Sequence, residues 1–134
     1  MSLPDEILRE IVLKNGLITE EPLKVVLEYA QNTKTSLINT LLENNNIAEE
    51  KLGQAIASYY NVPYVDLSKQ TIPLEIARII PDRVARRVKA VAFSRDASEV
   101  KIALSDPSDK GILANISKKT GVRAVPYFAF EKNI

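Results

Sequence analysis

Five basic side chains lie within twelve residues near the middle of the sequence: Arg78, Arg83, Arg86, Arg87 and Lys89. Arg83, Arg86 and Arg87 are three and four residues apart, so they share one face of a helix. Guanidinium groups in this arrangement can make bidentate contacts with carboxylates or phosphates. The cluster is therefore a candidate for binding an anion or docking an acidic surface, and the alternative is a solvated face without a ligand.

Carboxylate pairs are the other candidates for chemistry. Glu20 and Glu21, and Glu49 and Glu50, hold equivalent places at the predicted starts of two helices. Such a pair can serve a metal site or acid–base catalysis, but at a helix N-terminus it also complements the helix dipole. We interpret both pairs as structural, and we expect Asp106 to cap a later helix rather than to act in catalysis.

Residue types that many enzymes need are missing. The 134 residues include no cysteine and no histidine, which excludes thiolate and imidazole chemistry, disulfides and metal sites of those ligands. The four glycines, at positions 16, 53, 111 and 121, are too far apart to form a phosphate-binding loop. We therefore expect no catalytic residue, no cofactor and no metal, and we predict that this segment is not an enzyme.

Composition is that of a globular protein. Eighteen Lys and Arg nearly balance seventeen Asp and Glu, and aromatic residues do not interleave with the arginine cluster, so nucleic-acid binding is not expected. No apolar run is long enough to span a bilayer, and the N-terminus lacks a signal peptide. We expect a cytoplasmic protein with no direct membrane insertion.

The N-terminal part of the chain repeats itself. Residues 8–27 match residues 37–56 at a constant offset of 29, with seven of twenty positions identical. Each copy predicts a helix, a turn and a second helix, so this part should form a pair of helical hairpins. The repeat predicts that Leu13 and Leu42, and likewise Leu23 and Leu52, occupy equivalent buried places. Gly16 suits the left-handed residue after the first helix.

The remaining residues predict a small β-β-α-β unit. Residues 88–94 and 100–104 alternate in polarity and are typical of a β-hairpin. A helix should follow Asp106 and end at Gly121, and Pro126 in the last strand indicates an edge position or a bulge. The predicted fold class is α+β, with a helical-hairpin subdomain over residues 1–61 and a small α+β subdomain over residues 62–134.

Several segments together resemble a known module. They are the repeated hairpins, YYNVPYVDL at 59–67, PDRVARR at 81–87, KIALSDPSD at 101–109, and the Gly121 turn into VRAVPY. In this order they resemble the N-terminal domain of the type II secretion and type IV pilus assembly ATPases, the general secretory pathway protein E family. The resemblance covers the chain from about residue 5 to the end.

The resemblance implies a docking role. In that family the module precedes a hexameric ATPase core and links it to the cytoplasmic domain of an inner-membrane secretion or pilus platform protein. The P-loop of the parent ATPase would lie downstream of Ile134. The residues offer two candidate contact surfaces: the face of Arg83, Arg86 and Arg87, and a first helix that carries Ile7 and Ile11.

The alternative is a regulatory module of the same ATPase family that binds cyclic di-GMP. The relatives that bind it carry, in each hairpin, a leading arginine, leucine and glycine, a glycine in the turn and a final glutamine. Here the leucines are Leu8 and Leu37 and the turn residues are Gly16 and Asn45. The leading arginine and glycine and the final glutamine are absent from both copies, and Ile7 and Tyr59 stand at two of those places. We therefore prefer the docking interpretation.

Overall fold

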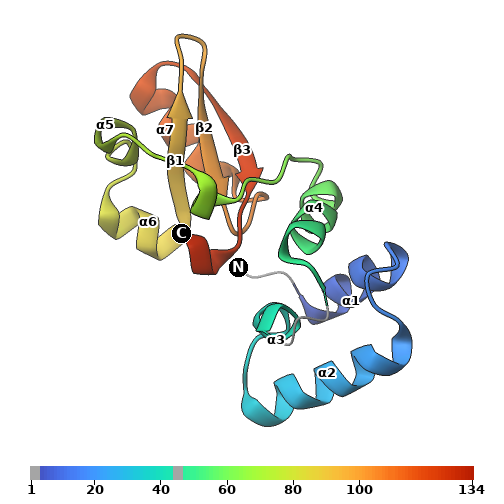
Figure 1. The fold of residues 1–134 in the computed structure, drawn as a ribbon. Coiled ribbons are helices and arrows are strands. Elements are labelled where there is room, and N and C mark those ends of the chain that lie inside the picture. Colours follow the sequence, from blue (N-terminus) through green and yellow to red (C-terminus); the bar gives the residue numbers. More distant parts are fainter. Residues whose placement is uncertain (1–3, 44–46) are drawn as a thin grey trace.

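Four helices form one end of the molecule, and they are the helices of the repeat (Figure 1). The computed structural model describes residues 4–43 and 47–134. The helices are α1 (Asp5–Lys14), α2 (Glu20–Thr33), α3 (Leu37–Glu43) and α4 (Glu49–Tyr59). The predicted turn of the second hairpin, which includes Asn45, lies outside the described residues.

Equivalent positions of the two hairpins have similar surroundings. Leu23 and Leu52 are both fully buried, at 0% exposure, as the repeat predicts. Leu13 and Leu42 also match each other, but both are only half-buried at the edge of the helical core. Gly16 adopts φ +66° just after α1, a conformation that glycine reaches without a steric penalty.

A three-stranded sheet forms the other end. It consists of β1 (Ala90–Arg95), β2 (Glu99–Leu104) and β3 (Arg123–Phe128), in the order β1-β2-β3. β1 and β2 form the predicted antiparallel hairpin, and β3 returns parallel to β2 after helix α7 (Lys110–Thr120). Pro126 lies in an edge strand, as predicted, since β3 pairs with β2 alone among the strands. These elements confirm the α+β class.

Both faces of the sheet are covered. Helices α5 (Leu74–Ala77), α6 (Asp82–Val88) and α7 pack on one face, over a core that includes Ile80, Ile102 and Ile116. The short 3₁₀ helices η1 (Leu67–Lys69) and η2 (Glu131–Asn133) flank the sheet. A smaller cluster around Phe93 and Ala103 covers the second face.

Aromatic residues join the two ends of the molecule. Phe128 and Phe130, from the end of the chain, are buried in the core of the four helices. Their ring centroids are 5.2 Å apart, and the ring of Tyr64 lies 6.4 Å from Phe128 and 6.0 Å from Phe130. Residues of the predicted second subdomain thus complete the core of the first. The division into subdomains 1–61 and 62–134 stays a prediction.

Helix α7 begins later than the sequence predicts. The expected cap, Asp106, instead accepts hydrogen bonds from the backbone N–H and the hydroxyl of Ser108, which form a local turn. The residue at the N-cap is Asp109, whose carboxylate accepts a 3.4 Å hydrogen bond from the N–H of Ile112. Asp106 is thus a turn residue, because its nearest donors lie two residues ahead rather than in the first turn of α7.

Candidate docking and nucleotide-binding surfaces

A groove of about 310 Å³ runs between α1 and α4. We call it the α1–α4 groove; its lining residues are Ile7, Glu10, Ile11, Lys14, Asn15, Ala55, Ser58 and Tyr59. The small side chains of Ala55 and Ser58 leave room beside α1. Ile11 is buried at 5% exposure and forms the floor, while Tyr59 is 50% exposed at the rim. An apolar floor with an exposed aromatic rim is typical of a protein-docking surface.

A larger groove of about 500 Å³ lies between the helical end and the sheet end. We call it the inter-half groove; its lining residues are Asp5, Leu8, Ser36, Leu37, Ile38, Asn39, Lys89, Ser105, Phe128, Phe130 and Glu131. Its floor is apolar, because Leu8, Leu37 and the two phenylalanines are at most 2% exposed. At its rim the ammonium of Lys89 lies 3.6 Å from a carboxylate oxygen of Glu131.

A third groove, of about 270 Å³, lies between α6 and α7. We call it the α6–α7 groove; its lining residues are Ile79, Ile80, Pro81, Val84, Arg87, Val88, Asp109, Ile112, Asn115, Ile116 and Lys119. The ammonium of Lys119 donates a 2.8 Å hydrogen bond to the carbonyl oxygen of Ile79, which fixes a cation at the rim. Arg87 adds a second cation from α6.

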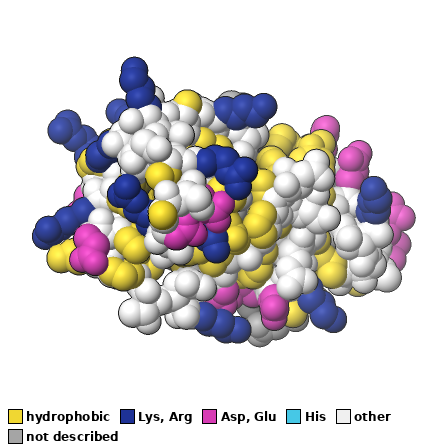
Figure 2. Space-filling model, turned by 90° about the horizontal axis from the view of Figure 1, so that it is seen from above, with side chains coloured by type: hydrophobic (Ala, Val, Ile, Leu, Met, Phe, Trp, Pro, Cys, Tyr) yellow, Lys and Arg dark blue, Asp and Glu magenta, His cyan; other side chains and the backbone are white. Residues whose placement is uncertain are grey.

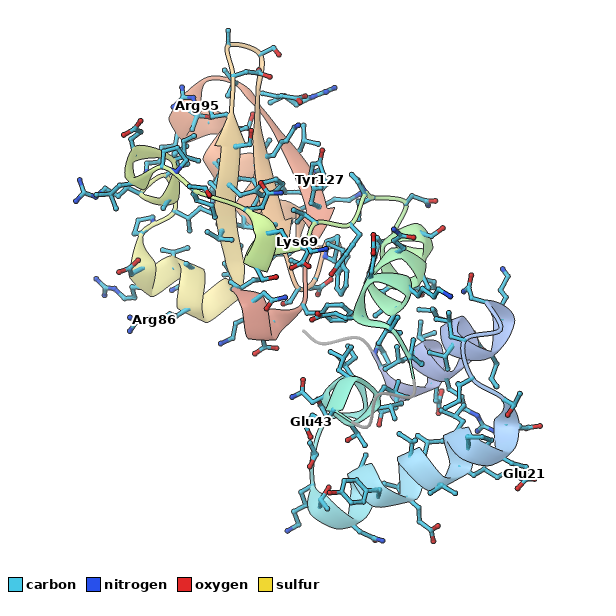
Figure 3. The ribbon with its side chains drawn as sticks, viewed as in Figure 1. Glu21, Glu43, Lys69, Arg86, Arg95 and Tyr127 are labelled. Carbon is cyan, nitrogen blue, oxygen red and sulfur yellow. The ribbon has the colours of Figure 1, made fainter. Side chains whose placement is uncertain are left out.

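The structure separates the two predicted docking surfaces. Ile7 and Ile11 line the α1–α4 groove, whereas Arg83, Arg86 and Arg87 are exposed on α6 at the sheet end. Figure 3 shows Arg86 pointing away from the sheet into solvent. Of the three, Arg87 lines the α6–α7 groove. The arginines and the first helix therefore cannot contribute to one small contact.

The residues proposed to bind cyclic di-GMP do not lie together in one site. Leu8 and Leu37 meet in the floor of the inter-half groove. Gly16 lies at the other end of α1, exposed and with no atom within 4 Å of an added Cβ. Asn45 lies outside the described residues, so the second turn cannot be compared.

Tyr59 is the site residue that sequence reasoning did not assign to a surface. It lines the α1–α4 groove together with Ile7. The sequence did carry a signal for this pairing. Ile7 occupies the first position of the cyclic di-GMP motif in the first hairpin, and Tyr59 occupies the last position of that motif in the second hairpin. The resemblance implies an arginine and a glutamine at these two places in relatives that bind cyclic di-GMP, and this chain has Ile7 and Tyr59 there.

Two tyrosines have raised pKa values. Burial, with nearby Asp66, Glu49 and Glu50, raises the pKa of Tyr64 to about 12. Its buried hydroxyl has no hydrogen-bond partner among the described residues. Burial also raises the pKa of Tyr60. None of these features forms a recognisable catalytic arrangement.

Residues 4–43 and 47–134 contain neither a metal site nor a membrane-spanning helix. No group of three or more His, Cys, Asp or Glu side chains in these ranges could hold a metal ion. Within the same ranges, no helix combines the length and apolarity needed to cross a membrane.

Known proteins resemble this chain over nearly its whole length. The type IV pilus assembly ATPase PilB of Thermus thermophilus is 29% identical over 129 residues, which cover 95% of this chain and 14% of that protein. PilB of Myxococcus xanthus is 25% identical over 127 residues, covering 95% of this chain and 22% of that protein. The chain thus spans less than a quarter of the length of either relative.

Solved structures share the fold. A structure of MshE with cyclic di-GMP has a TM-score of 0.65 and 25% sequence identity, and covers 94% of this chain and 91% of that chain. The N-terminal domain of XpsE has a TM-score of 0.59 in one crystal form, at 14% identity, and covers 99% of this chain and 93% of that chain. At this identity the XpsE likeness shows the fold alone.

These comparisons confirm the resemblance to the N-terminal domains of type II secretion and type IV pilus ATPases. The matched segment, residues 60–134, starts at the end of α4 and includes the whole sheet with α5, α6 and α7. It is described by the family model of the MshEN domain. Since this match covers more than half of the sequence, the chain belongs to the MshEN domain family.

Proposed function

We propose that this chain is a non-catalytic docking domain of a secretion or type IV pilus assembly ATPase. It couples the ATPase core to the cytoplasmic domain of an inner-membrane platform protein, and it works in the cytoplasm at the membrane. The observation that carries the proposal is the α1–α4 groove. Its floor is apolar at the buried Ile11, and Tyr59 is exposed at its rim, which suits an apolar anchor from a partner protein.

The groove suits an apolar anchor from the partner. Ile7 and Ala55 line it, and Glu10 and Lys14 supply charges of both signs at the rim. A buried anchor surrounded by such a rim accounts for most of the affinity of a protein interface, whereas exposed charge pairs contribute about 0–1 kcal/mol each.

A pull-down tests the proposal. The cytoplasmic domain of the platform protein encoded beside the parent ATPase is the bait, and Ile7→Glu with Tyr59→Ala is the test variant. We expect this variant to lose binding. Arg86→Glu with Arg87→Glu should still bind, because those side chains lie on α6. Glu10→Gln, at the rim of the same groove, is the matched control and should bind normally.

Two results would refute this assignment. Normal binding by the Ile7 and Tyr59 variant would place the interface outside the α1–α4 groove. ATP hydrolysis that follows the folded protein through purification would contradict the non-catalytic role, which we expect because the sequence has no glycine-rich phosphate loop.

Binding of cyclic di-GMP is the second candidate function. It is favoured by the likeness to MshE, whose structure was solved with that nucleotide. The motif leucines Leu8 and Leu37 also form the floor of a groove of about 500 Å³. Against it stand Ile7 and Tyr59, which lack the guanidinium and amide that would contact phosphate and guanine.

Calorimetry separates the two functions. At tens of micromolar protein we expect no saturable heat with cyclic di-GMP. Binding at low micromolar affinity that is lost when Leu8 is changed to a polar residue of similar size, with the fold intact by circular dichroism, would promote the second candidate.

A further inference from the structure

Charge is divided unevenly between the two ends of the molecule. Residues 1–61 contain five Lys and Arg against nine Asp and Glu, which gives −4, whereas residues 62–134 contain thirteen against eight, which gives +5. Figure 2 shows several Asp and Glu side chains at the right end of the face it presents and most of the Lys and Arg side chains farther left, with some of the other sign at each end. One end of a copy is therefore complementary in charge to the other end of the next copy.

The positive end carries a groove with a basic rim. The α6–α7 groove has an apolar floor that includes Ile80, Ile112 and Ile116. Arg87 and Lys119 stand at its rim. The one carboxylate that lines the groove, that of Asp109, already accepts the N–H of Ile112 at the start of α7. With a volume of about 270 Å³ the groove can admit one aromatic side chain.

The negative end carries an exposed apolar ridge with acidic flanks. Val25 is 67% exposed and Tyr29 is 52% exposed, and they lie one turn apart on the outer face of α2. Glu21 lies four residues before Val25 and Glu28 three residues after it on the same helix, and both are exposed. Figure 3 shows Glu21 pointing outward from α2. Large apolar side chains that are this exposed mark a candidate interaction surface.

We propose that copies of this chain associate head to tail, with the outer face of α2 seated in the α6–α7 groove of the next copy. Tyr29 enters the groove, and Glu21 and Glu28 approach the cations of α6 and α7. The two surfaces cannot meet within one copy, because α2 and α6 lie at opposite ends of the molecule (Figure 1). A contact of this kind closes into a ring or extends as a filament if each pair of copies makes it once, and it gives a two-fold dimer if two copies make it reciprocally.

A second copy fits this groove better than an unrelated acidic protein, since the same chain supplies both the apolar ridge and the charges that match it. The association should be weak for a single domain, because one aromatic anchor and a few exposed charge pairs bury little surface. It should also weaken with salt, because the charges on both sides are exposed.

Cross-linking is a clean test because the chain has no cysteine of its own. Asn32 lies on the outer face of α2 and Asn115 lines the α6–α7 groove, and both are exposed. We expect a mixture of Asn32→Cys and Asn115→Cys proteins to give a covalent dimer with a short bis-maleimide. The yield should exceed that of either variant alone several-fold and fall in high salt. Ala97→Cys, at the exposed tip of the β-hairpin, is the control partner and should give no excess.

Charge reversal then identifies the occupant. Glu21→Lys with Glu28→Lys, placed in the Asn32→Cys protein, should abolish the cross-link. Arg86→Glu with Arg87→Glu, placed in the Asn115→Cys protein, should do the same, and the two reversed proteins mixed together should restore it. Circular dichroism checks that each variant is folded.

Two outcomes overturn the proposal: no excess cross-linking in the original pair at near-millimolar protein, or no restoration by the doubly reversed pair. Either would leave an acidic partner of another kind as the occupant of the groove. The platform pull-down is independent, because Ile7→Glu should leave the cross-link unchanged.

Discussion

Gly53 lets α4 approach the aromatic residues that join the two ends of the molecule. A Cβ added at Gly53 would lie 2.3 Å from Cε1, 2.6 Å from Cδ1 and 2.7 Å from Cζ of Tyr64. The ring cannot withdraw freely, because Phe128 and Phe130 pack against it. Gly53→Ala should therefore force the ring or the helix to move, which costs about 1–3 kcal/mol in a packed site.

Helix propensity opposes this cost. Alanine in the middle of a helix is more favourable than glycine by about 0.5–1 kcal/mol. The net effect of Gly53→Ala should be a loss of about 0–2.5 kcal/mol of unfolding free energy. In a Tyr64→Ala background the clash is absent, and the same change should instead stabilise the chain by about 0.5–1 kcal/mol.

Urea unfolding of the four proteins in this double-mutant cycle measures the reversal of sign. Gly111→Ala is the control, because its added Cβ meets only an oxygen of Asp109, at the ordinary distance of 3.5 Å. It should not destabilise the chain. If Gly53→Ala has the same sign in both backgrounds, Tyr64 does not determine the need for glycine and the steric argument fails.

Three further predictions concern burial and acidity. Leu52→Ala should cost about 2–5 kcal/mol of unfolding free energy, since Leu52 is 0% exposed, whereas Leu74→Ala at 62% exposure should change it by less than about 0.5 kcal/mol in the same urea assay. The pKa of Tyr64, raised from 10.0 to about 12, implies stability that is complete below pH 10 and lost between pH 10 and 12; alkaline unfolding should show a weaker dependence on pH in Tyr64→Phe. Hydrogen bonds from Ser98 and Glu99 lower the pKa of Asp96, so its contribution is present above pH 3.8 and lost in more acidic solution; an NMR titration should show the pKa of Asp96 rising in Ser98→Ala, and no change would contradict the role of the hydroxyl.

Local signals in the sequence predicted the elements well. The 29-residue repeat predicted four helices, and Gly16 and Gly121 both adopt positive φ at the helix ends where they were expected. Alternating polarity predicted the hairpin, and Pro126 predicted an edge strand. These features are determined by residues close together in the chain, so they can be predicted from the sequence alone.

Features that depend on distant residues were not predictable in this way. Nothing near Phe128 or Phe130 indicates that these side chains belong to the helical core rather than to the sheet. The pairing of Ile7 with Tyr59 in one groove likewise needs the packing of α1 on α4. The start of α7 was misplaced for a local reason, since Asp106 and Asp109 both suit a cap and only Asp109 faces the first turn.

Completion of the helical core by Phe128 and Phe130 also has a consequence for synthesis on the ribosome. The four helices leave the exit tunnel well before these residues are made, so their core stays open on one side while the sheet is still being translated. During that interval the apolar surface later covered by the two phenylalanines is available to chaperones and to neighbouring nascent chains. The last residues of the domain therefore close the first part to be translated, and a nascent chain halted before Phe128 should remain sensitive to protease in its helical hairpins.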